Sequence, residues 1–160
     1  MILINLGGPF ALIVMTVFMF LLVPRERIYQ LFPVAAIFGS VLGITTYYLL
    51  QNVLQAWRFQ QMDLLCPAGI PIFMTLAWIP YSIIYFHMLA QYRTRAHNIL
   101  LILTAAAMPT FYHFLLELNG MFVFHRWPWW GNFFYALIVF NGLGHLVYHR
   151  VIAKPGATVG

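Results

Sequence analysis

Charged side chains are scarce in this sequence. Only 7% of its 160 residues are Asp, Glu, Lys or Arg, and the acidic ones number three. Soluble domains carry about 25% charged residues because they need a polar surface against water. The shortage excludes a water-soluble fold. It also leaves no basic cluster of the kind that holds a nucleic-acid backbone, so nucleic acid is not an expected partner.

Cysteines and catalytic motifs are also missing. The single cysteine, Cys66, has no second thiol with which to form an intramolecular disulfide. The chain has no glycine-rich phosphate loop, no G-x-S-x-G elbow, no H-E-x-x-H pair and no pair of intramembrane aspartates. We therefore expect a protein that is not an enzyme, although small membrane enzymes can act through scattered polar residues.

Apolar residues are abundant and fall in runs of about 20, the length of helix that crosses a hydrocarbon core about 30 Å thick. Hydrophobic residues make up 63% of the chain. The runs predict an all-α integral membrane bundle of five transmembrane helices, forming one domain over residues 1–149, with a short cytoplasmic tail at 150–160. The predicted spans cover about residues 2–23, 31–50, 67–91, 98–118 and 132–149.

Two details qualify this pattern. Between the second and third spans, the apolar residues have a spacing that a short helix lying on the membrane surface could use: Val53, Leu54, Trp57 and Leu65. Pro80 in the third span and Pro109 in the fourth each remove a backbone donor, which predicts bends with room for a ligand.

The basic residues predict the orientation of the bundle. Arg58 and Arg126 lie in connections on one side, whereas six basic residues lie on the other: Arg25, Arg27, Arg93, Arg95, Arg150 and Lys154. Because Lys and Arg accumulate on the cytoplasmic side, this asymmetry places the N-terminus outside and the C-terminus in the cytoplasm.

Small residues repeat every four positions on the second span, at Ala35, Gly39 and Gly43. Residues at this spacing share one helix face and let another backbone approach closely. The pattern predicts a helix-packing seam. A contact within the chain is the favoured interpretation, and a homo-oligomer interface is the alternative, since the same pattern serves both.

His113 and Glu117 lie one helical turn apart on the fourth span, and Glu117 is the one acidic residue within a predicted span. Intramembrane carboxylates are costly unless they are paired, so Glu117 marks either a binding site or a structural ion pair. We expect Arg126 first and Arg58 second to pair with it, with His113 completing the cluster.

A second group of histidines is predicted to lie near the other face of the membrane from His113 and Glu117. His145 and His149 are one turn apart on the fifth span, and His87 lies at a similar depth on the third. Metal and bis-histidine haem sites need imidazoles from facing helices, but interfacial histidines that bond to carbonyls or water give the same pattern. No cofactor is predicted, and a haem or metal at these three residues is the alternative.

Three stretches carry a resemblance. They are the run from Arg27 to Pro33, the third span with its prolines and tryptophan, and Glu117-x-x-Gly120 followed by His125-Arg126-Trp127. Together they resemble an uncharacterised family of small multi-pass membrane proteins of endospore-forming bacteria. The resemblance implies a bacterial cytoplasmic (inner) membrane and a multi-pass topology. It implies no activity.

These observations favour a non-enzymatic scaffold or accessory subunit of a membrane complex. Its partners would be the lipid bilayer and either another membrane protein or a second copy of the chain. The alternative is a membrane-embedded binder or carrier of a small apolar ligand, haem or a proton.

Overall fold

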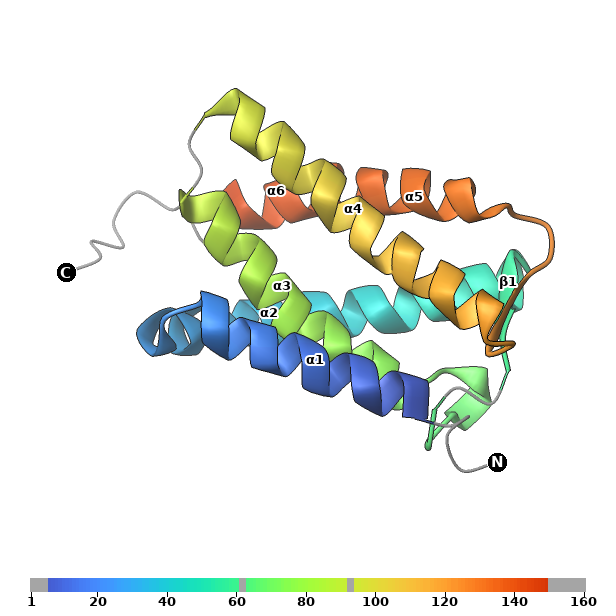
Figure 1. The fold of residues 1–160 in the computed structure, drawn as a ribbon. Coiled ribbons are helices and arrows are strands. Elements are labelled where there is room, and N and C mark those ends of the chain that lie inside the picture. The colour runs from blue at the N-terminus through green and yellow to red at the C-terminus, as the bar shows by residue number, and fades with distance from the viewer. Residues whose placement is uncertain (1–5, 61–62, 92–93, 150–160) are drawn as a thin grey trace.

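The chain is all-helical apart from two short strands (Figure 1). The computed structural model describes residues 6–60, 63–91 and 94–149. The predicted tail at 150–160, together with Arg93, lies outside these ranges. The α-helices are α1 (Gly7–Leu22), α2 (Arg25–Tyr47), α3 (Ile72–Gln91), α4 (Arg95–Leu118), α5 (Trp129–Ile138) and α6 (His145–Val147).

Two π-helical turns lengthen these elements. Tyr48–Val53 continues α2, and Val139–Gly144 joins α5 to α6. Within the described residues, three helices are long and apolar enough to cross a membrane: Arg25–Val53, Ile72–Gln91 and Arg95–Leu118. Gly7–Leu22 is a shorter apolar helix.

Some helices begin away from the predicted starts of the spans. The third span was expected from residue 67, but Pro67–Gly69 forms a 3-10 turn, and α3 starts at Ile72. Ala68 and Gly69 have φ of 52° and 77°, a left-handed conformation that an α-helix does not contain. The helix therefore starts only after this turn.

Among the described residues after the second span, the expected surface helix is not formed. Instead β1 (Trp57–Phe59) pairs antiparallel with β2 (Phe122–Phe124), and Trp57 lies opposite Phe124. Along β1 the side chains alternate from buried through exposed to half-buried, which is the period of a strand rather than of a helix. The pairing partner is distant in the sequence, so a local pattern does not reveal it.

Helix α3 is the centre of the packing. It contacts both α1 and α2, whereas α4 packs mainly against α5 (Figure 1). The seam of Ala35, Gly39 and Gly43 is buried against α3. A Cβ on Gly39 would lie 2.8 Å from the backbone of Trp78, so only glycine permits this approach. The seam is a contact between α2 and α3 within this chain.

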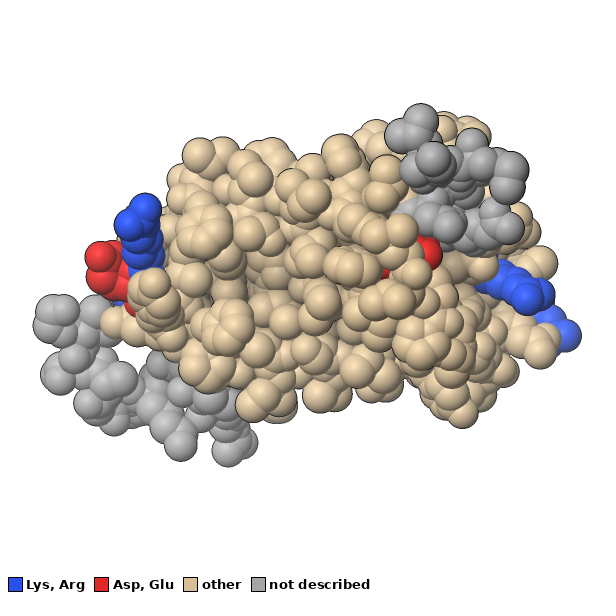
Figure 2. Space-filling view, turned by 90° about the horizontal axis from the view of Figure 1, so that it is seen from below, with Lys and Arg blue, Asp and Glu red and all other residues tan. Residues whose placement is uncertain are grey.

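The long axis of the bundle has two different ends (Figure 1). The sheet end carries β1, β2 and the first residues of α1, α3 and α5. The turn end carries the connections from α1 to α2 and from α3 to α4. On the face that Figure 2 shows, charged side chains lie toward the two ends, and we call the uncharged surface between them the charge-free belt.

Candidate functional site

His113 is the most enclosed polar residue among those predicted to form a site. Its side chain is 3% exposed, and its Nδ1 lies 2.6 Å from Nδ2 of Asn132 on α5. Its ring stacks on Phe122 with the centroids 4.9 Å apart. Because the amide nitrogen of Asn132 donates to Nδ1, the neutral imidazole carries its hydrogen on Nε2. His113 therefore joins α4 to α5 inside an aromatic cage.

Glu117 does not join a cluster with His113, Arg58 and Arg126. It is half-buried near the C-terminal end of α4. Within the part of the chain that the structure describes, it forms no ion pair, and His113 bonds to Asn132 instead. Glu117 lies one turn further along α4 than the buried His113, in the last turn of the helix, where its side chain is only half-buried. The predicted ion pair is not formed.

Asp63 is the buried carboxylate of the sheet end, and sequence reasoning did not single it out. It is 5% exposed and accepts a hydrogen bond of 3.0 Å from the backbone N–H of Met74, in the first turn of α3. A Cβ on Gly8 would collide with the carboxylate. Asp63 thus caps α3 and packs against α1. It lies nine positions before Ile72, outside any local capping pattern.

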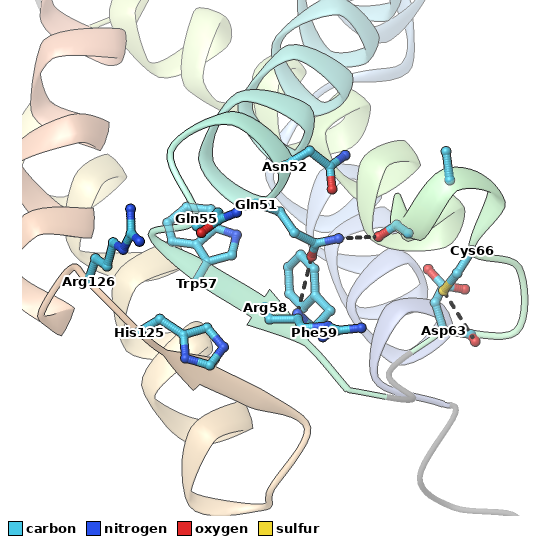
Figure 3. A pocket seen from close by; sticks show the side chains of 12 residues that line it. Gln51, Asn52, Gln55, Trp57, Arg58, Phe59, Asp63, Cys66, His125 and Arg126 are labelled. Carbon is cyan, nitrogen blue, oxygen red and sulfur yellow. Dashed lines mark hydrogen bonds between the residues drawn. The ribbon is translucent and has the colours of Figure 1, made fainter.

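An open cavity of about 940 Å³ lies at the sheet end, and we call it the sheet-end cavity (Figure 3). Most of the residues that line it are polar, and β1 contributes two aromatic rings. The lining residues are Gln51, Asn52, Gln55, Trp57, Arg58, Phe59, Asp63, Cys66, Ala68, Gly69, His125 and Arg126. The structure therefore brings Arg58 and Arg126 to one cavity, whereas His113 and Glu117 do not line it.

Hydrogen bonds to the backbone position this lining. Gln51 donates through Nε2 to the carbonyl of Gly69 at 2.9 Å and accepts from the N–H of Phe59 at 3.2 Å. The N–H groups of His125 and Arg126 both donate to the carbonyl of Ala56. The segments 51–59, 63–69 and 125–126 are thereby held around one opening (Figure 3).

The lone cysteine lies in the same lining. Its Sγ is 3.7 Å from the backbone oxygen of Asp63, and the residue is exposed. Desolvation, together with the negative charge of Asp63, raises the pKa of the Cys66 thiol. The thiol is accessible but predominantly protonated at neutral pH.

A second hollow, which we call the lateral groove, runs between α1 and α4 over α3. One part of it, of about 200 Å³, lies toward the sheet end, and we call it the outer part. The other, of about 440 Å³, lies toward the turn end, and we call it the inner part. Both parts are lined by Met15, Phe18, Tyr81 and Met108. Other lining residues include Phe10, Leu22, Tyr47, Met74, Trp78, Tyr85, Met88, Leu100, Thr104, Pro109, Tyr112 and His113.

The histidines near the turn end form a pair, not a triad. His145 and His149 have stacked rings with centroids 5.5 Å apart, whereas His87 is buried on α3. Within the described ranges, His, Cys, Asp and Glu side chains form no group of three or more that could hold a metal ion. Within these ranges, His87 therefore does not join His145 and His149 in a group of three ligands.

Comparisons of this chain with protein-family models, curated proteins and solved structures gave no match.

Proposed function

We propose that the chain is a multi-pass protein of a bacterial cytoplasmic membrane that holds the acyl chain of a membrane lipid in its lateral groove. The proposed topology has five spans, with the N-terminus outside and the C-terminus in the cytoplasm. The charge-free belt between the two ends supports it (Figure 2), as does the excess of basic residues in the connections of the turn end.

The observation that carries this function is the chemistry of the groove wall. Tyrosines line the groove, but their hydroxyls are already engaged inside the protein. Tyr81 donates to the carbonyl of Ala105, Tyr112 donates to that of Gly7, and Tyr47 accepts from the indole N–H of Trp78. The wall therefore offers mainly carbon to an occupant, and a hydrocarbon chain is the complementary ligand.

The dimensions of the groove agree with this ligand. Along α1 it extends from Phe10 to Leu22, which are twelve helical steps apart, or about 18 Å of helix. That length slightly exceeds one leaflet, which is about half of a 30 Å hydrocarbon core. Methionines at positions 15, 74, 88 and 108 add flexible side chains that adapt to an irregular occupant.

A scaffold or accessory subunit, which the sequence favours, would need a free packing face. The small residues of α2 do not provide one, because α3 covers them. Pro109 lines the outer part of the groove, as expected for a ligand space beside a proline in α4. For these reasons, binding of a lipid acyl chain is the function that the geometry supports best.

Native mass spectrometry of the protein purified in mild detergent tests the proposal. We expect the wild type to retain a phospholipid adduct. Met108→Trp should lose it, because Met108 lines both parts of the groove and is 47% exposed, so that an indole would fill the space. Leu103→Trp is the matched control. Leu103 lies on the same helix and is 42% exposed, but it does not line the groove.

Three results would overturn the proposal. The first is a wild type that carries no lipid after purification, and the second is a Met108→Trp variant that retains the adduct as fully as Leu103→Trp does. A lipid-free dimer that Met108→Trp converts to a monomer would assign the groove to a second copy of the chain. Circular dichroism and size-exclusion elution of both variants verify that they are folded.

A further inference from the structure

The basic residues of the sheet-end cavity have no carboxylate partner. The chain has three acidic residues, and the structure describes all of them. Glu26 belongs to α2 at the turn end, Asp63 accepts hydrogen bonds from backbone N–H groups, and Glu117 forms no ion pair within the described ranges. The guanidinium groups of Arg58 and Arg126 are therefore not neutralised by a side chain of this protein.

The backbone nevertheless holds these cations around one opening. Arg58 is the central residue of β1, opposite Val123 of β2, and His125 and Arg126 follow β2 directly. The bonds of 2.9 and 3.3 Å from the N–H groups of His125 and Arg126 to Ala56 fix the second loop against the first. Figure 3 shows the side chains arranged around the same cavity.

Further donors surround the two arginines. The carboxamides of Asn52 and Gln55 line the cavity, and so does Trp57, whose buried Nε1–H has no acceptor among the described residues. Guanidinium groups present a planar fork of donors that matches the oxygens of phosphate. The lining offers cations and donors but, with Asp63 engaged by the backbone, no free carboxylate.

We propose that the sheet-end cavity binds a phosphate group through Arg58 and Arg126. Two sources present this chemistry at a membrane edge: the headgroup of an anionic phospholipid, and a phosphate-bearing solute free in water. The inference is independent of the lateral groove, which shares no lining residue with this cavity.

The sole cysteine supplies the reporter. Cys66 lines the cavity and is exposed, so an environment-sensitive fluorophore attached there reports on what enters. In one arm, labelled protein in phosphatidylcholine nanodiscs is titrated with inorganic phosphate. In the other arm, its emission is compared between phosphatidylcholine nanodiscs and nanodiscs that also contain phosphatidylglycerol. A saturable response in the first arm identifies a free phosphate as the source, and a response confined to the second identifies the headgroup.

Variants decide whether the response arises in this cavity. Arg58→Gln and Arg126→Gln should each weaken it about tenfold, because each removes a charge-assisted hydrogen bond to phosphate. Arg25→Gln, at the exposed start of α2 on the turn end, should leave it unchanged. The proposal is overturned if the wild type responds in neither arm, if both cavity variants respond like the wild type, or if Arg25→Gln weakens the response equally.

Discussion

Asp63 and Glu117 are chemically similar but lie in different surroundings. Asp63 is buried in a loop and accepts hydrogen bonds from the backbone N–H groups of Leu65 and Met74. Glu117 lies half-buried in the last turn of α4, where none of the described basic side chains forms an ion pair with it. A carboxylate contributes to stability through the donors it satisfies. Asp63 therefore matters more to the fold than its place outside the spans suggests.

We predict that Asp63→Asn destabilises the protein by about 1–3 kcal/mol, because an amide group cannot accept both backbone bonds as the carboxylate does. Glu117→Gln should change the stability by less than about 0.5 kcal/mol, as substitutions of unpaired surface groups usually do. Thermal unfolding of both variants in the same detergent measures the difference.

An equal loss of stability in the two variants would contradict this prediction. It would mean that Glu117 has a partner in the membrane environment that is worth as much as the two N–H groups at Asp63. Asp63→Glu is a useful control, since it keeps the charge but lengthens the side chain beside Gly8, where space is short.

Sequence reasoning grouped His113 with Glu117, but it did not identify the partner of His113. His113 and Glu117 share a helix spacing, which suggested a cluster, but Asn132 from α5 is the actual partner of His113. That hydrogen bond depends on how α4 and α5 are rotated against each other. A spacing within one helix does not contain this information.

Among the helices, the clearest correspondence between sequence and structure is the seam on α2. Its small residues predicted a close helix contact, and α3 makes that contact at Gly39 and Gly43. The sheet was not predictable in the same way. Its strands have three residues each, and the ring contacts that support it, such as Phe59 with Phe122 at 5.1 Å, join distant segments.

Gly39→Ala should destabilise the bundle by about 1–3 kcal/mol, since the added methyl group overpacks an interface that has no free space. Its Cβ would lie 2.8 Å from the backbone carbonyl of Trp78, which cannot move aside as a side chain can. Gly142→Ala is the control, because a Cβ there meets nothing within 4 Å. Thermal unfolding should show a lowered midpoint for the first variant and an unchanged or raised one for the second.

The same comparison separates packing from helix propensity. Alanine favours a helix over glycine by about 1 kcal/mol, so both substitutions gain equally in that respect. If Gly39→Ala were as stable as Gly142→Ala, then α2 and α3 would not be in close contact, and the seam would face another molecule.

At the scale of the whole molecule, composition was the strongest guide. Apolar runs predicted the helices, because in a hydrocarbon solvent only the helix satisfies every backbone group within a single segment. Composition did not predict the sheet-end cavity, because the positions of its polar lining residues depend on backbone hydrogen bonds between separate segments.

The orientation has a direct test. We predict that a reporter fused after residue 160 is cytoplasmic, because six of the eight basic residues lie in connections assigned to that side. Labelling of Cys66 in intact cells with a membrane-impermeant maleimide should succeed, since Cys66 lies at the opposite, sheet end. Labelling that requires broken cells would mean that the bundle is inverted.

The pairing of β1 with β2 has a consequence for biosynthesis. Trp57 and Phe124 are neighbours in the sheet, but they are synthesised at different times, because α3 and α4 lie between them in the sequence. Until α4 has been inserted, β1 has no partner strand, and its edge stays open. The wall of the sheet-end cavity is completed only when the second loop arrives. Occupancy of that cavity would therefore distinguish chains that extend past β2 from shorter ones, and the cavity is complete before α5 and α6 are made.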